Sequence, residues 1–183
     1  KKAKKGGTLR VGYINNGAFK GIFSPEIADD GPTLELAQFG MVSLFKIDPN
    51  NEFKRGGLAD ISFDRKNKTA TVKISKRAKW SDGHPVVARD LSFAYEIVAN
   101  KAVGSSHYSE ELENIEGMRE YHNGTADKIS GLEEKDEKTL VIHFKKMKPT
   151  MTTTGSGYIL ESAEPYHYLK NVAMKDLVAS DKL

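Results

Sequence analysis

The sequence predicts an α+β fold, in which hairpins and helices follow one another without a strict strand–helix alternation. Residues 60–63 and 69–74 alternate in polarity around a polar turn, which is typical of a β-hairpin. Residues 129–132 and 140–144 flank a second, charged turn and predict another hairpin. Between the hairpins, residues 88–100 repeat apolar side chains at helical spacing.

The N-terminal third predicts a strand, a helix and a second strand. Residues 8–13 alternate after two glycines and predict a strand. Residues 33–42 predict a helix, because Pro32 suits a first helical turn and apolar residues recur behind it. Residues 44–47 alternate again, and residues 48–51, with the sequence Asp-Pro-Asn-Asn, predict a turn.

The second half predicts further helices. Residues 109–122 form the second, more acidic helical pattern, which Asn123-Gly124 should end. The Thr/Gly-rich residues 148–157 are expected to be a link. Residues 164–169 and 172–178 each predict a short helix.

The charge balance argues against a nucleic-acid partner. The formal net charge is +3 over 183 residues, but Lys1, Lys2, Lys4 and Lys5 carry the excess. The remaining 24 basic and 25 acidic residues nearly cancel, whereas a nucleic-acid binder normally concentrates positive charge on its folded body. Cysteine is absent, which excludes disulfides and thiolate metal sites in this sequence.

Enzyme and metal motifs are also missing. There is no Gly-rich nucleotide loop, no Walker lysine loop and no nucleophile elbow. The histidines are spread along the sequence, at His84, His107, His122, His143 and His167. A zinc centre needs about three ligands at consistent spacing, so we predict surface or half-buried histidines, no metal site, no cofactor and no enzymatic activity.

The segment around the only tryptophan has a clear physical interpretation. Asp82-Gly83 predicts a tight turn, and Pro85 extends the chain before the helix. Asp90 faces the positive end of the helix dipole. Trp80 is expected to pack the first hairpin onto the helix, so that the whole segment is scaffold.

This segment also resembles the signature of the oligopeptide/dipeptide/nickel class of extracellular solute-binding proteins. The matching residues are Lys79, Trp80, Ser81, Asp82, Gly83, Pro85, Val86, Ala88, Asp90, Phe93 and Tyr95. Weaker matches lie at residues 6–12, 58–60 and 123–131. Residues 155–169 resemble the oligopeptide binders of Gram-positive bacteria. Val87 departs from the pattern, which usually has Thr there, so another group would have to cap the helix.

The resemblance implies part of a two-lobed fold of the type II periplasmic-binding-protein class. Residues 32–149 would be the extra α+β domain inserted in the first lobe. Residues 1–31 would begin that lobe and residues 150–183 would return into it, while the second lobe would lie outside this sequence.

The resemblance implies extracellular capture of oligopeptides between two lobes for ATP-driven uptake. The implied partners are oligopeptides and the membrane permease subunits of an ABC transporter. The implied location is the outer face of a bacterial cytoplasmic membrane, with anchoring through a lipidated Cys outside this sequence. The alternatives are a signalling-peptide (pheromone) receptor and a surface adhesin module. A fourth, nickel or haem capture, is disfavoured by the scattered histidines.

Ligand contacts are expected from loops at the strand ends of the first lobe. These candidates are Asn15, Asn16, Phe19 and Ser24 after the first strand, and Gly155, Ser156, Gly157 and Tyr158 at the return into the lobe. The glycines would let a peptide backbone approach closely, and the two aromatic rings could pack a side chain. Simple turn chemistry is the alternative interpretation of both segments.

Overall fold

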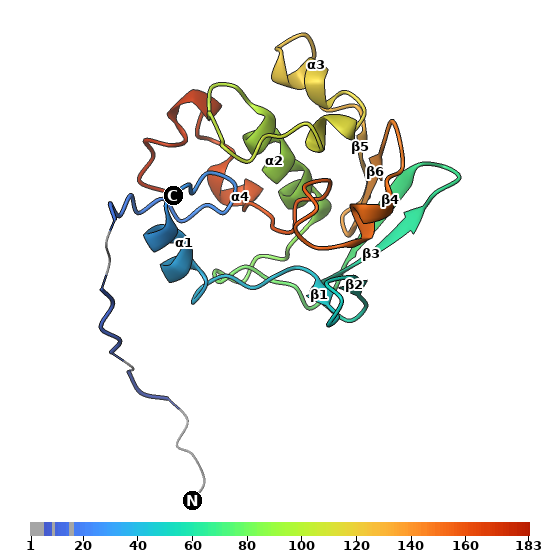
Figure 1. Ribbon diagram of the computed structural model, residues 1–183. Coiled ribbons are helices and arrows are strands. Elements are labelled where there is room, and N and C mark those ends of the chain that lie inside the picture. Colours follow the sequence, from blue (N-terminus) through green and yellow to red (C-terminus); the bar gives the residue numbers. More distant parts are fainter. Residues whose placement is uncertain (1–5, 9, 15–16) are drawn as a thin grey trace, which may run out of the picture.

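The two predicted hairpins form one four-stranded antiparallel sheet in the computed structural model, which describes residues 6–8, 10–14 and 17–183 (Figure 1). The strands run in the order β3-β4-β6-β5. Their bounds are Ala59–Asp64 for β3, Thr69–Ile74 for β4, Leu132–Asp136 for β5 and Thr139–His143 for β6. The pairing of β4 with β6 joins the hairpins, with Ala70 opposite Ile142 and Val72 opposite Leu140. These four side chains are buried because they share one face of the sheet.

The helix α2 (Ala88–Ala99) lies between that sheet and the C-terminal part of the chain, as Figure 1 shows. Leu91, Tyr95 and Val98 join the core under the sheet. Phe93 and Ile97 point elsewhere, into a second apolar core. A helix that is apolar on nearly all sides is buried on all sides, so α2 is the centre of the molecule.

The second core joins segments from both ends of the chain. Ile27 comes from the N-terminal part, while Leu169 and Leu177 come from the C-terminal part. Leu169 ends α4 (Tyr166–Leu169), and Leu177 follows the 3-10 turn η3 (Met174–Asp176). The N-terminal segment around Ile27 and the C-terminal segment from Leu169 to Leu177, which we call the two flanks, therefore pack on the face of α2 that the sheet does not cover.

The predicted helix after Pro32 is present but short. It is α1 (Gly31–Ala37), with Pro32 in its first turn and with the Asp30 Oδ1 atom accepting from the Thr33 N–H at 2.9 Å. It ends before residue 42 because the chain turns at Gly40, a residue with low helix propensity. The next two strands, β1 (Lys46–Ile47) and β2 (Phe53–Lys54), form a small hairpin.

The prediction of one helix over residues 109–122 is wrong. The segment forms the 3-10 turn η1 (Leu112–Asn114) and the helix α3 (Met118–His122), with a break between them. Gly117 at the break has a φ of 73°, which ends any continuous right-handed helix. The Glu116 N–H donates to the His143 carbonyl at 3.0 Å, so a backbone hydrogen bond connects the break to β6.

Two further predictions need correction. Residues 8 and 10–13 form no strand among the described residues, since a strand needs a hydrogen-bonded neighbour. Leu9 lies outside the described residues. In the second hairpin, β5 begins three residues later than predicted, because the charged residues 133–136 belong to the strand and not to the turn.

The C-terminal link and tail are only partly helical. The link contains the 3-10 turn η2 (Pro149–Thr152), whose Met151 side chain is fully buried. The predicted helix over residues 172–178 is reduced to η3. Among the described residues, no helix has the length and apolar character needed to cross a membrane.

Candidate functional site

A hollow of about 980 Å³ opens between the segment after α1, the turn before α2, and α4. We call it the α1–α4 hollow. Its apolar lining includes Phe23, Met41, Val42, Trp80, Val86 and Tyr168. Polar groups at its edge include Lys79, Asp82 and Lys182. A concave, mainly apolar surface with a few polar groups is the usual form of a binding site.

Asp90 holds together segments that line the hollow. Its Oδ2 atom accepts from the Trp80 indole at 2.9 Å and from the Val87 N–H at 3.0 Å, while Oδ1 accepts from the Tyr166 N–H at 3.0 Å. The side chain is buried, so three charge-assisted bonds satisfy a carboxylate that would otherwise be costly. Asp90 thus makes the half of a capping box that satisfies the Val87 N–H, while its own N–H donates to the Val87 carbonyl at 3.0 Å. It also joins the Trp80 segment to α4.

A pair of buried carboxyl groups, Glu26 and Glu164, lies at the hollow, and Glu164 is one of the residues that line it. The Ser24 hydroxyl donates to Glu164 Oε1, and the Ser162 hydroxyl donates to Glu26 Oε1. Burial first, and then the neighbouring Glu26 carboxylate, raise the pKa of Glu164 well above its usual value. A protonated Glu164 can donate to Glu26 Oε2, which has no other hydrogen-bond partner among the described residues.

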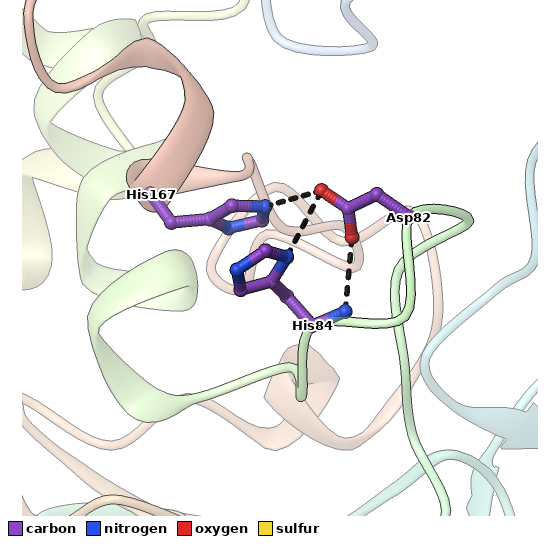
Figure 2. Close-up of side chains that lie close together, drawn as sticks. All are labelled: Asp82, His84 and His167. Atoms are coloured by element: carbon purple, nitrogen blue, oxygen red, sulfur yellow. Dashed lines mark hydrogen bonds and ion pairs between the residues drawn. The ribbon is translucent and has the colours of Figure 1, made fainter.

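Two histidines and one aspartate meet on the rim of the hollow, as Figure 2 shows. His167 Nε2 lies 2.7 Å from Asp82 Oδ2, and His84 Nδ1 lies 3.2 Å from the same oxygen. The imidazole rings stack with their centroids 4.2 Å apart. Hydrogen bonds from the His167 ring, and then from the His84 backbone N–H, lower the pKa of Asp82 to about 2.

The histidines are exposed or half-buried, as predicted, but His84 and His167 lie side by side although they are distant in the sequence. They are 83 positions apart in the sequence, and α4 brings His167 back beside the turn that carries Asp82 and His84. A short spacing, Asp82-Gly83-His84, was the available local signal. The position of His167 beside this turn could not be found from the sequence, because it depends on the packing of α4 on α2.

A family model decides the identity of the chain. The model of the bacterial extracellular solute-binding proteins, family 5 middle, matches residues 55–180. The chain belongs to this family. The resemblance seen around Trp80 is thereby confirmed, and so is an α+β portion of the two-lobed fold.

Individual relatives of this family-5 chain include oligopeptide-binding proteins. It is 46% identical over 146 residues to the oligopeptide-binding protein OppA of Lactococcus lactis subsp. lactis. That match covers 78% of this chain but 24% of the relative, so the chain spans about a quarter of the length of that protein.

Solved structures show the same relationship. A lactococcal OppA complexed with an endogenous peptide in the closed conformation superposes with a TM-score of 0.84 at 42% identity, covering 87% of this chain and 31% of the other. The pheromone receptor PrgZ superposes with a TM-score of 0.69 at 26% identity, covering 87% of this chain and 31% of that receptor.

The residues proposed to contact a ligand lie in different environments in this family-5 chain. Phe19 is exposed and meets Phe23 edge-on, with ring centroids 6.0 Å apart. Ser24 is buried and its hydroxyl is engaged by Glu164, so it faces the interior. Asn15 and Asn16 lie outside the described residues.

The second proposed segment forms an ordered turn. The Gly155 N–H donates to Glu161 Oε1 at 2.8 Å, and Gly157 lies against Glu111. Ser156 is half-buried, and Tyr158 packs on the core under the sheet. No interaction joins this turn to Phe19 among the described residues, so the structure does not gather the two segments into one cluster.

Proposed function

We propose that this chain is part of an extracellular protein that captures oligopeptides for ATP-driven uptake, and that it acts by binding and not by catalysis. The observation that best supports this proposal is the structural match to the peptide-bound lactococcal OppA, which covers 87% of this chain. The separate match to the family model, over residues 55–180, includes both the motif around Trp80 and α4.

The domain organisation is part of this proposal. Residues 32–149 form the inserted α+β domain, and residues 1–31 and 150–183 belong to the first lobe. The contacts between residues 20–31 and the C-terminal segment support the pairing of the two flanks, since Ser24 meets Glu164 and Glu26 meets Ser162. The second lobe lies in the part of the relatives that this chain does not span.

In this proposal the peptide is held between the lobes, with its backbone bonded as an added strand. Phe19 and the turn of Gly155, Ser156, Gly157 and Tyr158 contribute contacts from the first lobe, as do Asn15 and Asn16. The exposure of the Phe19 ring supports its role, because half of its surface is free to cover an apolar side chain. Ser24 acts indirectly, by holding Glu164.

The proposed partners are oligopeptides and the permease subunits of an ABC transporter, with no nucleic acid and no cofactor for capture. The proposed location is the outer face of a bacterial cytoplasmic membrane, with anchoring through a lipidated Cys outside this chain. A signalling-peptide receptor is the second candidate, which the superposition on the pheromone receptor PrgZ favours.

Native mass spectrometry of the longer protein, purified without denaturation, tests the proposal. We expect co-purified peptides of mixed sequence, because backbone bonding selects little among side chains. A single defined peptide would favour the signalling receptor. Folded protein that carries no peptide, and takes up none from a mixed peptide pool, would contradict both.

A further inference from the structure

We propose that Asp82, His84 and His167 form a binding site for a divalent transition metal of the zinc and copper class, which pins α4 to the turn before α2. The site lies on the rim of the α1–α4 hollow, which Asp82 helps to line. Its metal is a fixed structural ion, and not a transported ligand.

The ligand set suits such an ion. Two imidazole nitrogens and one carboxylate oxygen are common zinc ligands, and all three ligand atoms lie within 4.8 Å of one another. Two ligand atoms on a tetrahedral zinc ion are about 3.3 Å apart, given metal–ligand bonds of about 2.0–2.2 Å. The His84–Asp82 distance of 3.2 Å already fits, and the His167–Asp82 distance of 2.7 Å requires a small outward turn of one side chain.

The backbone holds the Asp82–His84 half of the site in place. The Trp80 N–H donates to the His84 carbonyl at 2.8 Å, and the Gly83 N–H donates to the Trp80 carbonyl at 3.0 Å. Gly83 has a φ of 91°, which permits the turn. The Asp82 Oδ1 atom accepts from the His84 N–H at 3.0 Å, which fixes the carboxylate.

The His167 half is held by two contacts, because Asp90 accepts from the Tyr166 N–H and the buried Leu169 anchors the end of α4. Both imidazoles direct one nitrogen toward the same oxygen of Asp82 (Figure 2), so an ion would bind among these three atoms once that carboxylate moves outward. The side chains are 46%, 60% and 26% exposed for Asp82, His84 and His167. An ion could therefore enter from solvent and keep a water as its fourth ligand.

The only tryptophan provides a reporter. The Trp80 ring lies 6.4 Å from the His167 ring, so a paramagnetic Cu²⁺ ion at the site would quench its fluorescence. Copper is the strongest binder among the divalent first-row metals and is the suitable first probe. Zn²⁺, which does not quench, should then compete and restore the emission.

The experiment titrates Cu²⁺ into the 183-residue chain without an affinity tag, at neutral pH, and repeats the titration with His84→Ala and His167→Gln. We expect quenching that saturates at one equivalent and is reversed by a chelator. Each variant should weaken binding at least about tenfold, as expected when a ligand is lost. Calorimetric titration with Zn²⁺ should give the same stoichiometry and should rank the parent and the variants in the same order of affinity.

The matched control is His143→Gln. His143 also pairs with a carboxylate, at 2.9 Å from Glu133, but has no second imidazole in its pair, so this variant should bind as the parent does. Metal-free unfolding midpoints establish that His84→Ala is folded, as its exposure predicts. The proposal would be overturned if the parent showed no saturable metal binding or if both site variants bound as tightly as the parent. An equal loss of metal affinity in His143→Gln would also overturn it.

Discussion

Individual polar side chains hold together segments that are far apart in the sequence. Asp90 joins the segment around Trp80 to α4, and the Ser24–Glu164 and Glu26–Ser162 bonds span 140 and 136 positions. Each of these groups is buried or half-buried, so each bond is made where water cannot replace it. The stability of both flanks should therefore depend on a few protonation states and not on apolar contact alone.

The Glu164 carboxyl gives the fold a pH dependence of known sign. Its pKa is raised in the folded chain, so folding favours its protonated form. This contribution is complete below the unfolded pKa of about 4.3 and is lost as the pH rises through the folded pKa. Glu164→Gln retains the neutral form at every pH, and its amide can still donate to Glu26 and accept from Ser24.

We expect Glu164→Gln to differ least from the parent in stability below about pH 4.3, and to gain on the parent by at most about 1.4 kcal/mol per pH unit as the pH rises above it, because the unfolded parent then releases a proton that the folded parent retains. Thermal unfolding across this range measures the difference. Glu110→Gln, at an exposed position, is the control and should leave the pH profile unchanged. A constant difference between Glu164→Gln and the parent at all pH values would show that proton binding is not involved.

At the scale of elements, the break before α3 depends on one glycine. A Cβ atom at Gly117 would lie 2.7 Å from the Ser130 backbone nitrogen, in addition to the cost of its positive φ. Gly124, at the end of α3, has a similar φ of 74° with nothing within 4 Å of its Cβ position. The pair therefore separates the cost of the clash from the cost of the backbone conformation.

Gly124→Ala should lose about 1–2 kcal/mol, the usual penalty for a left-handed non-glycine residue. Gly117→Ala should lose more, about 2–4 kcal/mol, because Ser130 and the bond from Gly131 to Glu116 must also move. Urea unfolding of both variants provides the comparison. Equal losses would mean that the contact between residues 117 and 130 adds nothing.

The same elements show what the sequence could predict. The β3–β4 hairpin and α2 were predicted within one or two residues, because their periodicity matches their burial. The break at Gly117 was missed, since the helical pattern continues across it and only pairing with β6 decides the local conformation. The family motif identified the kind of protein, whereas His84 with His167, and Glu26 with Glu164, depend on tertiary packing that no local pattern records.

At the scale of the whole molecule, this chain offers one wall of the proposed cleft. We expect it to bind peptides more weakly than the longer protein does, because closed-cleft binding buries the ligand between two lobes. Loss of one charge-assisted bond alone, about 1.5–3 kcal/mol, weakens binding roughly ten- to 150-fold. Calorimetric titration of one peptide into both proteins measures the ratio, and equal affinities would place the entire site within these residues.

The central position of α2 has a consequence for how the chain opens. Its Leu91 and Val98 side chains belong to the core under the sheet, and its Phe93 and Ile97 side chains belong to the core formed by both flanks. The amide protons of α2 can reach deuterated solvent only after both cores have separated from it, so their exchange follows global unfolding. The sheet and the two flanks are thus coupled through one helix into a single cooperative unit.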